Sequence, residues 1–326
     1  MHLKPHETVT ITVHPRLHLT LIGMNENGHR VNGGVGFSVA SPTANITVRR
    51  ASHLSVIDRR PSPLEPIEIE KLMGTVRGMG LGSFEVTIEG HLPSHCGFGS
   101  ATALRLATIE GVSEIADTKI DRLEAVRLSG RGGTSGIGIT TYFDGGIVCD
   151  IGVRHSANVL APSSAIEGTR PTPYILHAKP MPSWPIGICI PGNIASLSLL
   201  EETEFFQNSC PIPTSEVYST LYEVIYGLIA SAAENDIHTF CNSIRQIQTC
   251  RWKALERDLY GPTLLSLEES IYKAGALAVG MSSLGPGLFF LAENLPSTVA
   301  NLRERLPSHT WIATACHNLG RSKVHT

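Results

Sequence analysis

A glycine-rich segment at residues 93–103, PSHCGFGSATA, leads into an Ala- and Leu-rich stretch with helical spacing. If a helix begins there, the amides of its first turn have no acceptor inside the helix and favour an anion. A tight glycine turn with Ser100 as the helix N-cap would explain the same residues. The segment is not a Walker loop, because no Gly-Lys-Ser/Thr follows. The candidate phosphate-binding residues are Gly97, Gly99, Ser100, Ala101 and Thr102.

A second glycine-rich segment, SGRGGTSGIGITTYFDGG at 129–146, carries only two charged side chains, Arg131 and Asp144. Its central GGTSG places two hydroxyl groups among glycine amides, which suits a nest for phosphate or pyrophosphate. A flexible linker, or a surface loop with a solvated Arg131, is the alternative interpretation. The candidate binding residues are Arg131, Gly132, Gly133, Thr134, Ser135 and Gly136.

A third segment, GMSSLGPG at 280–287, lies between two apolar stretches. Its candidate residues Ser282, Ser283 and Gly285 either form a turn or close a site shared with the first two segments. Near the N-terminus, HPRLHL places Arg16 and His18 on the same face of an expected strand. Such a face looks either into water or into a cleft, and the glycine segments favour the cleft.

The remaining titratable residues give weaker signals. His14, His18 and His95 lack the spacing of metal ligands, so a zinc site is not expected. Cys96 has the character of a small buried hydrophobic residue. Glu201, Glu202 and Glu204 are expected to form a solvated acidic face, with a magnesium role for one of them as the minor alternative.

Composition excludes several classes of protein. With 326 residues, 42% of them hydrophobic, the chain is long enough for two globular domains. The net charge of −3 argues against a nucleic-acid or membrane surface. No apolar run reaches the roughly 18 residues that span a bilayer, and residues 1–12 lack the apolar core of a signal peptide. Seven cysteines without a CxxC pair predict no disulfide framework, so a cytoplasmic location is expected.

The hydrophobic pattern predicts the elements that must position these residues. In the first half, strands and glycine turns precede two helices, and in the second half strands and helices alternate as two split β-α-β units. A proline-rich junction at 155–184 separates the halves. Three strands are expected near the N-terminus: residues 8–13, a strand that ends in a turn at 25–28, and a strand after a break at Gly33-Gly34. Further strands are expected at 44–49, 84–88, 186–190 and 310–315, with two more around 280–287. Expected helices are a short one before residue 84, one from 100, and 121–129, 215–234, 237–248, 264–276 and 297–306, with 129–146 as a loop.

The three segments, in this order after Arg16-Leu17-His18, resemble the GHMP kinase superfamily over essentially the whole chain. The resemblance implies an α+β, two-domain fold. Residues 1–165 would form a ribosomal-protein-S5-like β/α domain with the phosphate loops, and 166–326 a ferredoxin-like α/β sandwich. Kinases of this superfamily carry a catalytic Asp where Gly138 stands, and glycine cannot accept a hydroxyl proton.

One branch is similar in more detail, the β-ribofuranosylaminobenzene 5′-phosphate synthases. The chain departs from that branch at Ala103, where Gln is usual, and at Leu284 and Gly287. These departures leave the acceptor substrate open. The matching motifs are Arg16–His18, Arg30–Gly36, Gly130–Gly138 and Met281–Pro286.

The resemblance implies that phosphoribosyl pyrophosphate condenses with 4-aminobenzoate or 4-hydroxybenzoate, with loss of CO2 and pyrophosphate, in tetrahydromethanopterin biosynthesis. It also implies a homodimer and Mg²⁺ on the pyrophosphate, with Asp150 as a weak candidate ligand and no tightly bound organic cofactor. Alternatives are an ATP-dependent small-molecule kinase and a non-catalytic binding paralogue. The candidate catalytic residues are Arg16, His18, Arg30 and Arg131, with Arg16 or Arg30 on the benzoate carboxylate or the ribose phosphate.

Overall fold

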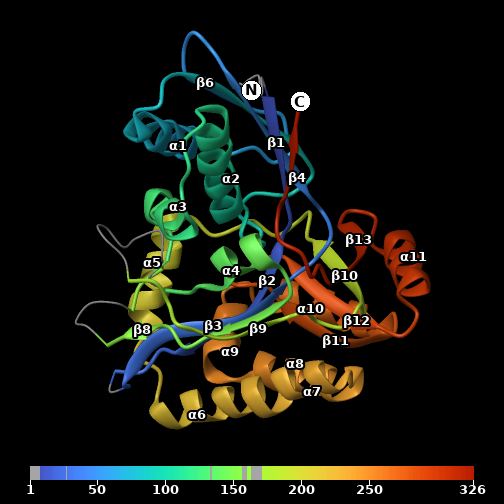
Figure 1. Cartoon of the computed structure of the whole chain (residues 1–326). Helices are drawn as coiled ribbons and strands as arrows, with labels where there is room; N and C mark the ends of the chain where they lie inside the picture. The colour runs from blue at the N-terminus through green and yellow to red at the C-terminus, as the bar shows by residue number, and fades with distance from the viewer. Residues whose placement is uncertain (1–7, 27, 133, 156–159, 163–170) are drawn as a thin grey trace.

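The computed structural model describes residues 8–26, 28–132, 134–155, 160–162 and 171–326. Gly133, one of the predicted phosphate-binding residues, lies outside the described residues. Over these residues the fold is α+β, with three β-sheets and helices packed against them (Figure 1).

The first sheet has the strand order β14-β1-β4-β6-β5. Alternation of buried and half-exposed residues along β1 confirms the strand that period-2 patterning predicts. Helix α2 packs on this sheet, and Gly111 allows the close approach, because a Cβ there would lie 2.6 Å from Val48 Cγ2. The elements are β1 (Thr8–Val13), β4 (Ala44–Arg50), β5 (Ser55–Asp58), β6 (Phe84–Gly90), β14 (Ser322–His325), α1 (Pro66–Met79) and α2 (Ser100–Ile115).

The second sheet contains the strand that carries Arg16 and His18. Its order is β2-β3-β7-β9, with β8 also paired to β3, so β2 lies at an edge. The expected break at Gly33-Gly34 is wrong, because β3 runs through both glycines. Gly33 has φ +83°, and a Cβ there would lie 2.7 Å from Asp150 O. The strands are β2 (Arg16–Gly23), β3 (Arg30–Ser38), β7 (Ile147–Asp150), β8 (Val153–Arg154) and β9 (Ile175–Lys179).

The third sheet is antiparallel, with the order β11-β12-β10-β13. This order, with helices between β10 and β11 and between β12 and β13, is the expected pair of split β-α-β units (Figure 1). Its strands are β10 (Pro185–Ile190), β11 (Ala276–Met281), β12 (Leu288–Ala292) and β13 (Thr310–Ala315). The helical segments of this half are α5 (Leu199–Ser209), α6 (Thr214–Tyr222), the π-helix η1 (Glu223–Ile229), α7 (Ala230–Glu234), α8 (Ile237–Thr249), α9 (Arg251–Asp258), α10 (Gly261–Lys273) and α11 (Leu295–Arg305).

The stretch 129–146, expected to be a loop, contains helix α4 (Ile137–Asp144) after α3 (Arg122–Ser129). Gly, Thr and Ile are weak helix formers, so local propensity does not predict α4. Tertiary packing decides instead, because Ile137, Ile139 and Tyr142 are buried.

The predicted domain boundary at 165/166 stays a prediction, as do the homodimer and the cytoplasmic location. Two segments after that boundary pair with strands from before it: β9 with β7, and β14 with β1. Within the described residues, no helix is both long enough and apolar enough to cross a membrane.

A buried carboxylate anchors the returning C-terminal segment. Glu110 on α2 accepts two hydrogen bonds from Arg321, at 2.9 and 2.7 Å, and one of 2.5 Å from the Tyr142 hydroxyl. Lys323 Nζ lies 3.0 Å from the same carboxylate. These ion pairs hold β14 against α2 and β1.

Arg321→Ala should lower the free energy of unfolding by about 2 kcal/mol, because Glu110 would lose its bidentate partner while it stays buried. Chemical denaturation measures the change. The control Lys273→Ala removes an ion pair whose side chains are 63% and 65% exposed, and should cost less than about 0.5 kcal/mol. Equal losses in the two variants would contradict the anchoring role of Glu110.

Candidate active site

The outer edge of β2 joins two of the glycine segments. On this edge, Arg16 N donates to Phe98 O (3.1 Å). Two positions further, His18 N donates to Ser282 Oγ (3.0 Å), and His18 O accepts from Ser283 N (2.7 Å). A single strand edge therefore brings together loops that are far apart in the sequence.

The carbonyl oxygen of Gly97 completes this junction. It accepts hydrogen bonds from Arg16 Nη1 (2.5 Å) and Ser282 Oγ (2.7 Å). Gly97 has φ +79°, and a Cβ there would lie 2.0 Å from Ser282 O. Gly99 has φ +73°, and its Cβ would lie 2.9 Å from Arg16 Cγ. Both positions require glycine, because the first loop lies directly against Arg16 and the third segment.

The predicted helix N-terminus is confirmed. Helix α2 begins at Ser100, and its N-cap Gly99 has no side chain to satisfy the first-turn amides. The amides of Ser100 and Ala101 have no acceptor inside the helix, and the helix dipole adds positive potential at this end. This terminus lines a pocket of ≈ 840 Å³.

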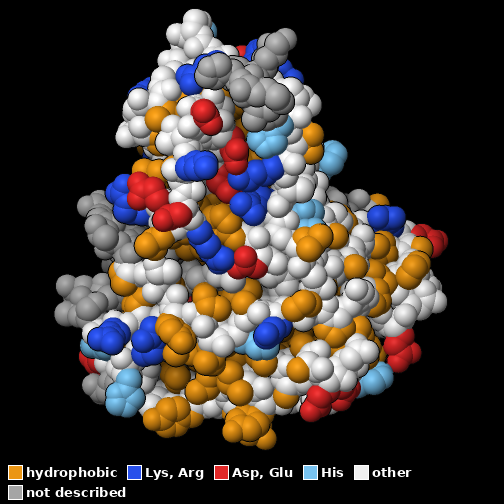
Figure 2. Space-filling view, viewed as in Figure 1, with side chains coloured by type: hydrophobic (Ala, Val, Ile, Leu, Met, Phe, Trp, Pro, Cys, Tyr) orange, Lys and Arg blue, Asp and Glu red, His pale blue; other side chains and the backbone are white. Residues whose placement is uncertain are grey.

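The pocket collects most of the predicted site residues. Basic and acidic side chains are interspersed on the molecular face seen in Figure 2. Gly136, Ser282 and Gly285 do not line the pocket. The predicted residues that line the pocket are Arg16, His18, Gly97, Gly99, Ser100, Ala101, Thr102, Arg131, Gly132, Thr134, Ser135 and Ser283.

Asp150 organises the second glycine segment instead of facing the pocket. Its Oδ2 accepts from Gly136 N (2.9 Å) and Ser135 Oγ (3.1 Å), and its Oδ1 accepts from Gly152 N (2.9 Å). The side chain is fully buried, and burial raises its pKa to about 6. The suggestion that Asp150 binds magnesium is therefore not supported, because backbone and hydroxyl donors already occupy both oxygens.

Arg30 also lies away from the pocket. Its Nε donates to Ile151 O and its Nη2 to Gly152 O, both at 2.7 Å. Its guanidinium lies 5.9 Å from the centre of the Tyr174 ring. Arg30 therefore fixes the turn after β7, which corrects the expectation that it binds a carboxylate or a phosphate.

Sequence reasoning missed a buried ion pair on α9 at the base of the pocket. Lys253 Nζ lies 2.6 Å from Glu256 Oε2 and donates to Ser283 O at 2.7 Å. Trp252 Nε1 donates to Glu256 Oε1 at 2.8 Å. The Lys253 and Glu256 side chains are 0% and 3% exposed. Their i, i+3 spacing in RWKALERD is also typical of solvated helix faces, so the sequence alone does not reveal their burial.

Two side chains of β2, the half-buried Arg16 and the buried His18, interact electrostatically with this ion pair. Burial lowers the pKa of Arg16 to about 10, so the guanidinium stays charged at neutral pH. Burial, with the nearby charges of Arg16 and Lys253, holds the pKa of His18 well below its ordinary value, so the imidazole is neutral. Within the described residues, Arg16 Nε and His18 Nε2 are buried without a hydrogen-bond partner.

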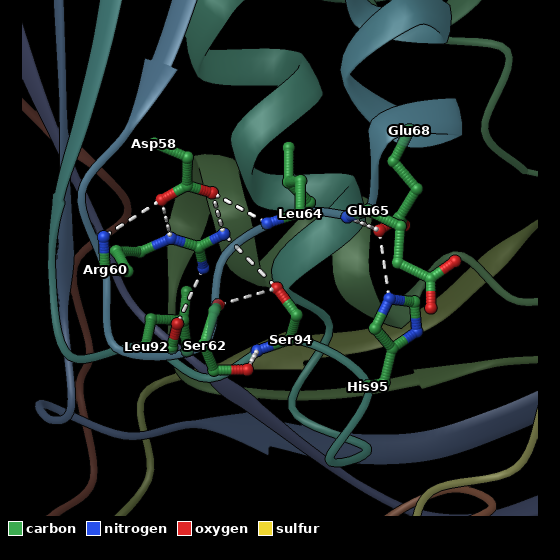
Figure 3. A network of polar contacts seen from close by, with 9 residues as sticks. All are labelled: Asp58, Arg60, Ser62, Leu64, Glu65, Glu68, Leu92, Ser94 and His95. Atoms are coloured by element: carbon green, nitrogen blue, oxygen red, sulfur yellow. Dashed lines mark hydrogen bonds and ion pairs between the residues drawn. The ribbon is translucent and has the colours of Figure 1, made fainter.

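A polar network fixes the loop that precedes α2 (Figure 3). At its centre, Arg60 Nη2 lies 2.6 Å from Asp58 Oδ2, and both side chains are almost fully buried. Arg60 Nη1 donates to Leu92 O (2.6 Å), and Nη2 donates to Ser94 Oγ (3.2 Å). These bonds fix Leu92 and Ser94, which lie in the segment that leads to Gly97.

Glu68 in the first turn of α1 forms an ion pair with that loop. His95 Nε2 lies 2.9 Å from Glu68 Oε2, and this contact raises the pKa of His95 and favours its protonated form (Figure 3). Glu202, expected to be solvated, is partly buried in the pocket, and burial raises its pKa. The other charged side chains that line the pocket are Glu65, Lys71, Arg105 and Glu201.

Fold and site define a member of the GHMP kinase superfamily. Residues 67–145 match the GHMP kinases N terminal domain. The structure is similar to that of L. major mevalonate kinase, with a TM-score of 0.70 and 14% identity over 98% of this chain and 99% of that one. It is also similar to homoserine kinase from Cytophaga hutchinsonii, with a TM-score of 0.65 and 12% identity over 99% of each chain. At these identities the likeness shows the fold alone.

Relatives of higher sequence identity show to which family within this superfamily the chain belongs. The chain is 34% identical to the β-ribofuranosylphenol 5′-phosphate synthase of Methanothermobacter thermautotrophicus, over 87% of this chain and 89% of that protein. It is 30% identical to the synthase of that name from Archaeoglobus fulgidus, over 86% of each. The chain belongs to the β-ribofuranosylphenol 5′-phosphate synthase family, which confirms the resemblance seen in its motifs.

Gly138 takes part in the site through its lack of a side chain. It lies in the first turn of α4 and is not among the glycines with positive φ. A Cβ at Gly138 would lie 3.8 Å from Arg16 Nε and 3.7 Å from Thr102 Cγ2. A short side chain therefore fits there and would point at the Arg16 guanidinium.

Gly138→Asp should keep the thermal stability of the protein but bind pyrophosphate about 10- to 100-fold more weakly. The new carboxylate would pair with Arg16 and repel the anion, and a charge-assisted contact contributes about 1.5–3 kcal/mol. Calorimetric titration measures the affinity, and Gly138→Asn is the uncharged control of matching size. Equal affinities in the two variants would show that a negative charge at position 138 does not reach the pyrophosphate site.

Proposed function

We propose that the chain condenses phosphoribosyl pyrophosphate with 4-hydroxybenzoate, with loss of CO2 and pyrophosphate, in methanopterin biosynthesis. The observation that carries the proposal is a single pocket in which a helix N-terminus, Arg131 and Arg16 converge on one space. Such a reaction needs anion binding, positioning and exclusion of water more than a strong base.

The donor would occupy the side of the pocket between α2 and the second glycine segment. The amides of Ser100 and Ala101 and the Arg131 guanidinium are suited to pyrophosphate oxygens. Thr134 and Ser135 line the same pocket, and their hydroxyls donate to Ala161 O and to Asp150 Oδ2. Loss of pyrophosphate leaves a cation-like ribosyl carbon, which the ring of the acceptor attacks.

Magnesium on the pyrophosphate would need few protein ligands, because Mg²⁺ is usually held by one or two carboxylates together with substrate phosphates. Within the described part of the chain, no cluster of three or more His, Cys, Asp or Glu side chains could hold a metal ion by itself. Glu202 is the better-placed carboxylate, because it lines the pocket and Asp150 does not.

The acceptor would occupy the base of the pocket. Leu21, Phe206 and Leu284 supply apolar surface for an aromatic ring, and Arg16 supplies a positive charge for a carboxylate. The relatives are named for a ribofuranosylphenol, which favours 4-hydroxybenzoate over 4-aminobenzoate as the acceptor. Kinase activity is less well supported, because Gly138 offers no group that could accept a hydroxyl proton.

Pyrophosphate release tests the proposed function. With phosphoribosyl pyrophosphate as donor, we expect release and CO2 formation only when the benzoate is also present. The assay is run with each benzoate separately and with neither. ATP-dependent phosphorylation, or failure to react with 4-hydroxybenzoate, would contradict the proposal.

Arg131→Ala should weaken binding of phosphoribosyl pyrophosphate about 10- to 100-fold in a folded protein, because it removes a charge-assisted phosphate contact. Calorimetric titration and a thermal melt provide the two readouts. The control is Arg127→Ala on α3, which removes an exposed ion pair with Glu124 outside the pocket. Unchanged affinity in the Arg131 variant would place Arg131 outside the donor site.

A further inference from the structure

The imidazole of His18 is a buried polar group that the binding of pyrophosphate does not explain. His18 is 4% exposed and lines the pocket. Its Nε2 has no hydrogen-bond partner within the described residues. Gly34 on β3 makes room for the ring, because a Cβ there would lie 2.7 Å from Nε2. An unsatisfied buried nitrogen is costly, and the ring that carries it lines the pocket, so the imidazole points to a ligand there.

The charged side chains around His18 determine which charge on that ligand would be favoured. Arg16 lies two residues earlier on the same face of β2, and Lys253 approaches from α9 beside its partner Glu256. These cations and burial keep the imidazole neutral and therefore able to accept a proton. The same cations favour a substrate whose ring substituent becomes negatively charged in the reaction. They disfavour a substrate whose ring substituent becomes positively charged.

We propose that His18 is the catalytic base that takes the proton from the 4-hydroxyl group of the acceptor and later returns it. The inference rests on the proposed function. As the bond between the ribosyl carbon and pyrophosphate breaks, the ring carbon bearing the carboxylate forms the new C–C bond. The 4-hydroxyl oxygen supplies the electron pair through the ring and gives its proton to His18.

The intermediate is then a neutral dienone that still carries the carboxylate. Loss of CO2 returns the electron pair of the broken C–C bond to the ring and leaves a phenolate. That phenolate takes back the proton from the His18 imidazolium, so atoms and charges balance without another reactant. A weak base is sufficient in the first step, because a protonated dienone is a much stronger acid than imidazolium.

The test compares two acceptors in wild type and His18→Gln. With 4-hydroxybenzoate, the variant should lose about 10²- to 10⁴-fold in kcat, the usual contribution of a positioned base. With 3,5-difluoro-4-hydroxybenzoate, assayed at a pH at which its hydroxyl is already ionised, the loss should be at least about tenfold smaller. A structural role would lower both rates by the same factor.

His18→Asn serves as the second variant, and affinity for phosphoribosyl pyrophosphate verifies that each variant keeps its donor site. Equal losses with both acceptors, or no loss with 4-hydroxybenzoate, would overturn the role of His18 while the proposed function stands. A wild-type protein that releases no pyrophosphate with either acceptor would overturn both.

Discussion

The outer edge of strand β2 is the constraint on which the site depends. Strand β2 pairs with β3 on one side, and on the other side its backbone binds the loop before α2 and the segment after β11. An edge strand exposes hydrogen-bonding groups that another segment can use. Here those groups hold two loops in register, so the same strand carries Arg16 and His18 and sets the position of the helix N-terminus beside them.

Burial of charge gives this arrangement its chemical character. Lys253 and Glu256 lie beneath the pocket as an ion pair that also binds Ser283 O. Leaving either charge buried without its partner would be strongly destabilising, so the pair fixes the base of the site. Asp150 does the same for the second glycine segment through hydrogen bonds to Ser135 and Gly136. The pocket thus presents anion-binding groups on loops that buried polar contacts hold in place.

Sequence patterns predicted the parts of this structure that depend on local chemistry. Period-2 alternation located β1, and the glycines before Ser100 located the start of α2. Patterns could not predict α4, whose helix depends on burial of Ile137 and Ile139. They also misplaced Arg30 and Asp150, because a motif shows which residues recur and not whether their polar atoms are already occupied by the backbone. Lys253 and Glu256 were missed for the related reason that an i, i+3 charge pair is usually solvated.

A crystal structure with phosphoribosyl pyrophosphate bound is the most direct test of the arrangement proposed for the site. The account predicts pyrophosphate oxygens within hydrogen-bond distance of the Ser100 and Ala101 amides and of the Arg131 guanidinium. It also predicts that the ribosyl carbon faces Arg16 and His18. A pyrophosphate bound outside this pocket, or a ribosyl carbon that faces away from β2, would contradict the account.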